Sequence, residues 1–204
     1  MKTGSYFIIL FIILCSCHQK RFDTEQALWN YIKEESHGYI QHKAVNGVDF
    51  TLTHLPTDLL VKRELGNEST EADIDSLRKK YGKYMYFNLS MAKNNRELLS
   101  NVAGNREQFG SMVNRLSFGM ENKVHLYTSK RDTILLADYL YPRMYGMSGG
   151  TTLLFIYPRD EKSLQEEYLN FTIEDIGLHT GEVRFKLPTP PIKNEPGLHL
   201  GKNK

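Results

Sequence analysis

The chain has 204 residues, of which 26 are basic and 24 acidic, giving a net charge of +2. A chain of this length can bury the core of one domain, since about 150 residues already bury roughly 70% of their surface. The sequence contains no basic block, which argues against nucleic-acid binding. Both cysteines lie within the first 17 residues, so we expect no disulfide and no cysteine-ligated metal site in the rest of the chain.

The first 17 residues have the pattern of an export signal. Lys2 precedes nine consecutive apolar residues, 6–14, a run shorter than the about 20 residues that span a bilayer. The run ends in Leu-Cys-Ser-Cys at residues 14–17, which resembles the lipobox of bacterial lipoproteins. The resemblance implies that residues 1–16 are a lipoprotein signal peptide and that Cys17 receives a diacylglycerol. An ordinary cleaved signal with two incidental cysteines is the alternative.

Helix and strand patterns follow along the chain. We expect residues 17–22 to form the lipidated cysteine and a short tether, and a helix to start at Asp23. Residues 39–53 predict a hairpin that turns at Asn46-Gly47, the dipeptide favoured where two residues need positive φ. The remaining predicted elements are helices at 58–65, 70–81 and 106–117 and strands at 84–91, 123–128, 133–141, 151–157, 168–174 and 182–187.

This order of elements predicts an α+β fold with a mainly antiparallel, β-sandwich-like core and three or four helical insertions. A ferredoxin-like layer is less favoured, because five predicted strands follow one another without a helix at the C-terminal end. We expect residues 23–187 to form a single globular domain. Residues 188–204 hold four of the seven prolines and few apolar residues, so this segment is predicted to be a disordered tail.

Aromatic and cationic residues around a glycine-rich turn form the candidate binding surface, which comprises Tyr139, Tyr141, Arg143, Tyr145 and Tyr157. Tyrosine rings supply contact area together with a polar tip, and arginine supplies a planar fork of donors. Such a surface suits a glycan or a protein partner. The alternative interpretation places these tyrosines in the core of the sandwich or at its rim.

The same turn gives the sharpest hint of catalysis. Residues 146–150 read Gly-Met-Ser-Gly-Gly and fit the G-x-S-x-G pattern around a hydrolase nucleophile, here Ser148. Asp175 (or Asp160) and His179 follow in the order that such enzymes use. The pattern requires a helix after the serine, whereas residues 151–157 predict a strand. We therefore expect a glycine turn without enzymatic activity, and a small serine hydrolase is the alternative.

The sequence predicts no metal and no cofactor. Residues 71–75 carry alternate acids like the start of a calcium loop, but the loop's glycine and final glutamate positions hold Ser76 and Gly82. The histidines lack the spacing of metal ligands. Residues 75–77 and 132–134 match the short O-glycosylation acceptor pattern of Bacteroidota, and their use is left open.

Three features together resemble uncharacterised cell-envelope lipoproteins of Bacteroidota: the lipobox, the hairpin leading to residues 55–60, and the turn at 145–148. The resemblance implies a lipid anchor in the outer membrane, since His18 stands where inner-membrane lipoproteins of enteric bacteria carry aspartate. The leaflet, periplasmic or surface-facing, is open. The expected function is a non-enzymatic module that binds or assembles with an envelope protein or glycan, and a domain that only scaffolds an assembly is a further alternative.

Overall fold

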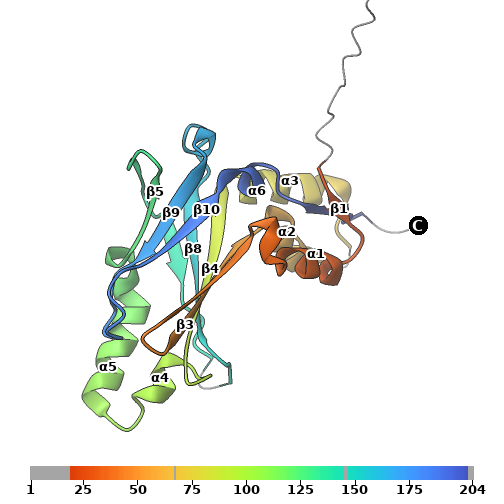
Figure 1. Cartoon of the computed structure of the whole chain (residues 1–204). Helices are drawn as coiled ribbons and strands as arrows, with labels where there is room; N and C mark the ends of the chain where they lie inside the picture. The colour runs from red at the N-terminus through yellow and green to blue at the C-terminus, as the bar shows by residue number, and fades with distance from the viewer. Residues whose placement is uncertain (1–18, 67, 145–146, 202–204) are drawn as a thin grey trace, which may run out of the picture.

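The computed structural model describes residues 19–66, 68–144 and 147–201. The fold is α+β with a sheet-rich core, as predicted, and the described residues form six α-helices and eleven strands. A two-sheet sandwich occupies one part of the molecule, and a smaller helical lobe projects from one end of it (Figure 1). In the part of the chain that the structure describes, no helix is both long and apolar enough to cross a membrane.

A five-stranded antiparallel sheet forms the first layer of the sandwich. Its strand order is β2-β3-β4-β8-β7. The bounds are β2 (Ile40–Val45), β3 (Val48–Leu55), β4 (Tyr84–Lys93), β8 (Thr151–Pro158) and β7 (Asp138–Leu140). The predicted hairpin joins β2 to β3, and Asn46 and Gly47 both have positive φ, 49° and 73°, as a tight two-residue turn requires.

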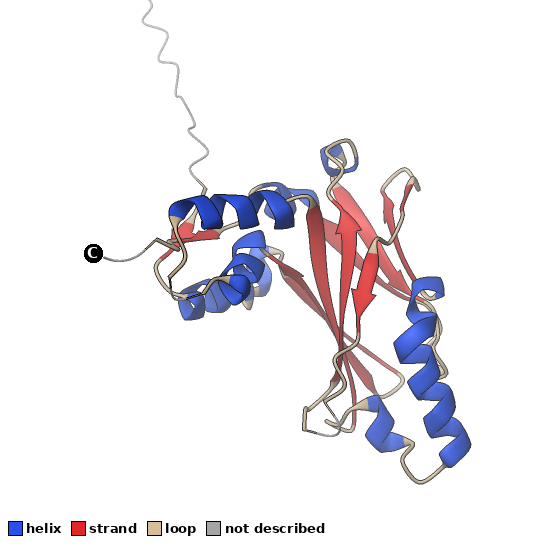
Figure 2. Ribbon diagram, turned by 180° about the vertical axis from the view of Figure 1, so that it is seen from behind, coloured by secondary structure: helices blue, strands red, loops and turns tan. Residues whose placement is uncertain are grey.

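The second layer is a four-stranded antiparallel sheet in the order β10-β9-β5-β6. Its strands are β10 (Val183–Pro188), β9 (Tyr168–Ile173), β5 (Val124–Thr128) and β6 (Thr133–Ile134). Two helices, α4 (Leu98–Asn101) and α5 (Arg106–Asn114), lie at the end of the sandwich away from the lobe (Figure 2). A π-helical turn, Arg115–Gly119, continues α5 toward β5.

Aromatic side chains from both sheets fill the space between the layers. Phe171 of β9 lies at the centre, with its ring centroid 5.7 Å from that of Phe155 and 6.0 Å from that of Phe87. Phe185 of β10, the register partner of Phe171 in the same sheet, lies with its ring centroid 6.4 Å from that of Phe171. All four rings are buried. The alternation of inward apolar residues that the sequence shows in these strands therefore builds the main core.

The helical lobe has a second, smaller core. It contains α1 (Glu25–Ile32), α2 (Thr57–Glu64), α3 (Glu71–Tyr81) and the parallel strand pair β1 (Arg21–Phe22) and β11 (Gly197–Leu198). Leu28, Leu59 and Leu198 meet in this core. Helix α1 begins after Thr24, whose hydroxyl accepts a hydrogen bond from the Ala27 amide, so the predicted capping by Asp23 is wrong by one residue.

The prediction that residues 188–204 form a disordered tail is wrong for the described residues 188–201. Pro188 ends β10, and the chain continues through α6 (Thr189–Lys193) into β11. Prolines occupy the first turn of α6, where a missing amide hydrogen removes no helical bond. Ile192 is 1% and Leu198 2% exposed. Few apolar residues suffice here because Ile192 and Leu198 are both fully buried.

The predicted domain limits of 23–187 are accordingly too narrow, since residues 21–22 of the expected tether also pair in a sheet with β11. The structure has more helices than the predicted three or four, because α4 and α6 were not predicted. They span only four and five residues. Elements this short give no readable helical period.

The central position of Phe171 makes a prediction about stability. Truncation in Phe171→Ala should lower the free energy of unfolding by about 3–5 kcal/mol, because it leaves a cavity between the two sheets. Phe118→Ala is the matched control, since that ring is 71% exposed and its loss should change stability by less than about 0.5 kcal/mol. Urea unfolding followed by circular dichroism measures both, and equal losses would contradict the assigned core.

Candidate functional site

The structure separates the predicted binding-surface residues. Tyr157 is fully buried, and its ring meets that of Phe87 edge-on at 6.0 Å, so its assignment to a surface is wrong. Tyr139 points into the same core and stacks on Phe155 at 5.9 Å. The alternative interpretation, that the tyrosines lie in the core of the sandwich or at its rim, therefore holds for these two residues. Strand alternation explains the inward position of Tyr157, because residues 153, 155 and 157 of β8 all face the core.

The other described members of that surface are less buried, although Tyr141 also packs against the main core. Arg143 is exposed, and its guanidinium donates a hydrogen bond to the Ser117 hydroxyl at 2.8 Å. Tyr141 is half-buried and lines a groove beyond the end of β7. Tyr145 lies outside the described residues, as does the lipidation site Cys17.

The residues of the hydrolase alternative are not joined to one another through their side chains. The Ser148 hydroxyl donates to the Gly150 carbonyl at 2.7 Å within its own turn. The Asp175 carboxylate accepts hydrogen bonds from the backbone amides of residues 177–179. Among the described residues, no hydrogen bond links the side chains of Ser148, Asp175 and His179. Strand β8 follows the serine at Thr151, so the expected helix-start amides are not supplied there.

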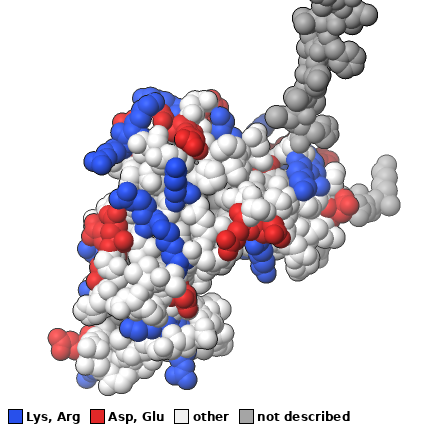
Figure 3. All heavy atoms as spheres, in the orientation of Figure 1, with Lys and Arg blue, Asp and Glu red and all other residues white. Residues whose placement is uncertain are grey.

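A groove lies in the angle between the helical lobe and the outer face of the five-stranded sheet, which Figure 3 shows in space-filling form. We name it the outer-face groove. Its volume is about 540 Å³, within the usual range for small-ligand sites. It is lined by Trp29, Leu55, Arg63, Asn88, Leu140, Tyr141, Pro142, Thr152 and Leu154.

Strand register positions the floor of the outer-face groove. Asn88 of β4 pairs with Leu154 of β8, and Leu154 pairs with Leu140 of β7, so the three side chains form one row across the sheet. Thr152 lies two residues from Leu154 on the same face. The floor therefore combines an apolar stripe with an amide and a hydroxyl.

The helical lobe and the chain after β7 supply the walls. Trp29 projects from α1, and its indole nitrogen donates to the Glu25 carboxylate at 3.2 Å, which fixes the orientation of the ring. Arg63 comes from the last turn of α2. Tyr141 and Pro142 stand at the β7 side of the groove. A bound molecule would therefore meet aromatic rings that come from two separate elements.

The polar groups of the groove are available to a ligand. Neither the Asn88 amide nor the Arg63 guanidinium makes a side-chain hydrogen bond or ion pair with any residue that the structure describes. The Thr152 hydroxyl has only a long contact, 3.5 Å, to the Ser90 hydroxyl. A half-buried amide without a partner offers two donors and one acceptor, which gives directional recognition to an otherwise apolar surface.

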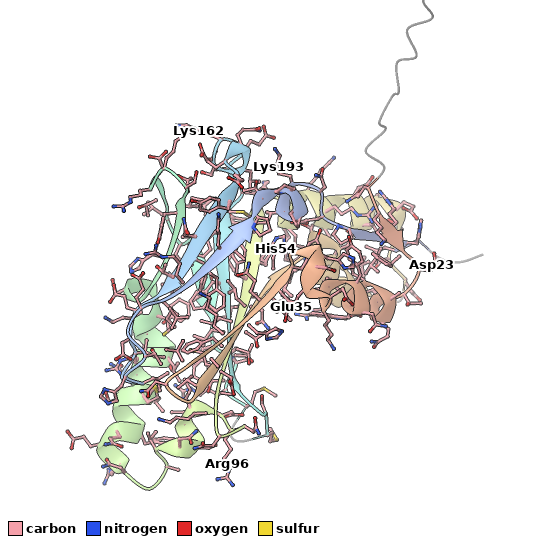
Figure 4. All side chains as sticks on the ribbon, viewed as in Figure 1. Asp23, Glu35, His54, Arg96, Lys162 and Lys193 are labelled. Atoms are coloured by element: carbon pink, nitrogen blue, oxygen red, sulfur yellow. The ribbon has the colours of Figure 1, made fainter. Side chains whose placement is uncertain are left out.

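A buried carboxylate holds the lobe against the sandwich. Glu195 lies between α6 and β11 and is 7% exposed. Its Oε1 accepts a hydrogen bond from Arg159 Nη1 at 2.6 Å and lies 3.3 Å from His54 Nε2. Its Oε2 accepts from the Thr57 amide at 2.8 Å. We call Glu195, Arg159, His54 and Thr57 the Glu195 junction; Figure 4 shows His54 where β3 enters the lobe.

The Glu195 junction also caps α2. Pro56 precedes that helix and provides no capping side chain, so the distant carboxylate satisfies the first amide and interacts favourably with the positive end of the helix. Burial raises the pKa of Glu195, but His54, Arg159 and the Thr57 amide outweigh it and hold that pKa at about 2. The carboxylate is therefore ionised in the folded protein near neutral pH.

A second ion pair fastens the same C-terminal segment. Asp58 in the first turn of α2 accepts two hydrogen bonds from the Arg78 guanidinium, both at 2.8 Å. It also accepts from the Leu198 amide at 2.7 Å. Asp58 therefore ties α3 and β11 to the start of α2.

Sequence reasoning missed most of these residues. Trp29, Arg63 and Asn88 come from three elements and have no characteristic spacing. One signal was available: Trp29 is the single tryptophan of the chain, and it stands beside Leu28, outside the stripe of α1 that is buried.

The described residues contain no group of three or more His, Cys, Asp or Glu side chains that could hold a metal ion.

Comparison with known proteins does not indicate a function for the chain. No family model matches the chain, and no curated protein matches it. One solved structure is similar, a protein of unknown function from Burkholderia pseudomallei K96243. The likeness covers 80% of this chain and 85% of that chain, with 11% identity and a TM-score of 0.41.

The Glu195 junction predicts a dependence of stability on pH. The folded-state pKa of Glu195 lies below its ordinary value of 4.5, so its ionised form stabilises the fold above about pH 4.5. That contribution, on the order of 3 kcal/mol, is lost as the pH falls toward 2. Glu195→Gln should lack this part of the acid sensitivity and lose about 3–5 kcal/mol at pH 7.

Urea unfolding at a series of pH values tests this expectation. Glu161→Gln is the control, because Glu161 is exposed and forms no ion pair with the described residues. If Glu195→Gln and wild type lost stability in parallel from pH 5 to pH 2, the ionised junction would be contradicted.

Proposed function

We propose that this protein is a lipid-anchored lipoprotein of the bacterial outer membrane that binds an envelope glycan, without catalysis, in the outer-face groove. The lipobox ending at Cys17 supports the anchor. The observation that carries the binding role is the groove itself, where Trp29 and Tyr141 flank a floor that contains the unpaired Asn88 amide. Aromatic faces with a few directed polar groups suit the alternating apolar and hydroxyl surfaces of sugars.

The position of the groove favours a glycan over a peptide segment. An extended peptide is recognised most simply by pairing its backbone with a free sheet edge. The outer-face groove lies on the face of β4 and β8, which are both paired on each side, so its contacts come from side chains. A protein partner that uses the same surface is the alternative outcome of the binding test.

The described lining of the groove is poor in the side chains that most often act as acids, bases or nucleophiles. Its lining contains no Asp, Glu, His, Cys or Ser among the described residues, and Thr152 has no base beside it. A general acid or base must lie within hydrogen-bonding reach of the reacting atoms. Binding is therefore the chemistry that this site supports.

Because Trp29 is the single tryptophan, intrinsic fluorescence reports on the groove directly. Soluble peptidoglycan fragments and outer-membrane polysaccharide, titrated in turn, should change its emission with saturation. Asn88→Ala should weaken that binding at least tenfold, about 1.4 kcal/mol, because an amide is lost from the floor. Asn30→Ala, an exposed change on the same helix as Trp29, should leave it unchanged.

If no glycan changed the fluorescence, and a protein partner were crosslinked only when Asn88 is present, the ligand of the groove would be a protein and not a glycan. Equal binding by the two asparagine variants would exclude the groove as the site.

The anchor has its own test in matched cysteine variants. Cells grown with radiolabelled palmitate should label wild type and Cys15→Ala but not Cys17→Ala, because the acyl chains are attached at Cys17. Labelling that persists in Cys17→Ala would contradict the anchor.

A further inference from the structure

A second cavity lies on the lobe, on the side where the described chain begins. It has a volume of about 520 Å³ and opens between residues 19–21, the start of α2, and the segment 193–195. None of the lining residues of this cavity belongs to the outer-face groove. We call it the basic pocket.

The walls of the basic pocket carry an excess of positive charge. Five cationic side chains line it, against the two carboxylates of Asp58 and Glu195. Both carboxylates already have partners: Asp58 takes two hydrogen bonds from Arg78, and Glu195 takes one from Arg159. The remaining cations are Lys20, Arg21 and Lys193, and none of them forms an ion pair with a residue that the structure describes.

These three cationic side chains differ in the contacts that they already make. The Lys20 ammonium lies 4.0 Å from the centroid of the Tyr31 ring, which gives it a cation–π partner. Lys193 has a long contact, 3.4 Å, to the Gln165 side chain. Arg21 is exposed and forms no side-chain hydrogen bond within the described residues. Arg21 and Lys193 are therefore the groups that a ligand would engage first; Figure 4 shows Lys193 on α6.

The charge pattern specifies the chemistry of a ligand. A small cationic ligand would be repelled, and a neutral one would leave the excess charge unmatched. A carboxylate would be a weaker match, because several donors around a cavity can be shared by the three or more oxygens of a phosphate group. Arginine and lysine together are the usual ligands of phosphate.

We propose that the basic pocket binds the phosphate group of an anionic phosphate ester. Arg21 and Lys193 contact the phosphate oxygens, and the paired Arg78 and Arg159 guanidiniums form the positive wall behind them. Their carboxylate partners keep those two arginines fixed in place, so the pocket is formed before the ligand arrives.

The position of the pocket favours a lipid headgroup as the source of the phosphate. Gln19, in the pocket wall, lies two positions after Cys17 in the chain, which is a reach of at most about 7 Å. An acylated Cys17 would hold the pocket close to the headgroups of its own leaflet. This choice of source rests on the proposed anchor, whereas the phosphate chemistry of the pocket does not. Free glycerol 3-phosphate is the alternative source.

Native mass spectrometry of the full, lipidated protein in nonionic detergent micelles separates these sources. Phosphatidylglycerol and phosphatidylcholine of equal chain length are added at equal mole fraction, and glycerol 3-phosphate is added in a separate arm. The intact mass reports acylation of Cys17 in the same preparation. We expect retained phosphatidylglycerol, at least tenfold above phosphatidylcholine, because only the former carries a net negative charge.

The double variant Arg21→Glu, Lys193→Glu should lose at least tenfold of this retention. Both side chains are exposed, so the variant should keep the melting temperature of wild type. Arg106→Glu, at the start of α5 at the end of the sandwich away from the lobe, reverses one charge outside the pocket and should retain the lipid.

Three results decide the inference. Retention of phosphatidylglycerol that the double variant loses supports a lipid headgroup. Binding of glycerol 3-phosphate alone, lost in the same variant, supports the phosphate pocket with a soluble source. Equal retention by the double variant and Arg106→Glu, or no binding in either arm, overturns the proposal, whatever the mass shows about acylation.

Discussion

The structure depends on one buried carboxylate. A charge that is removed from water costs several kcal/mol unless partners meet it, and Glu195 is met from three directions. Arg159 follows β8, His54 belongs to β3, and Thr57 begins α2. These partners come from both the sandwich and the lobe, so the negative charge is satisfied only when the lobe, the sandwich and the C-terminal segment are in their observed positions.

The shapes of both candidate binding sites depend on the Glu195 junction. The outer-face groove takes Trp29 and Arg63 from the lobe and Asn88 from the sandwich, so its width follows the angle that the Glu195 junction fixes. The basic pocket has Glu195 in its own wall. Moreover, Gln19 donates to the Glu195 carbonyl at 2.8 Å, which places the start of the described chain beside the pocket.

The parts of the fold that depend on local patterns could be predicted from the sequence. The alternation of apolar and polar residues predicted which side chains of β3, β4 and β8 face the core. The Asn46-Gly47 dipeptide predicted the hairpin. That the C-terminal segment is ordered could not be predicted, because it is stabilised by contacts with residues far away in the chain. Glu195 pairs with Arg159, 36 positions away, and the Leu198 amide donates a hydrogen bond to Asp58, 140 positions away. Composition alone indicated disorder there. Tyr157 was assigned to a surface although the alternation of β8 places it inward. The groove was missed because its lining comes from six separate elements, α1, α2, β3, β4, β7 and β8.

The Glu195 carboxylate and the Arg159 guanidinium stabilise the fold through each other. A double-mutant cycle of Glu195→Gln and Arg159→Met, with unfolding free energies measured in urea at pH 7, tests it most directly. We expect a coupling free energy of at least about 2 kcal/mol, because each single change removes the oppositely charged partner from the charge that remains. Effects of the two changes that add within about 0.5 kcal/mol would contradict it.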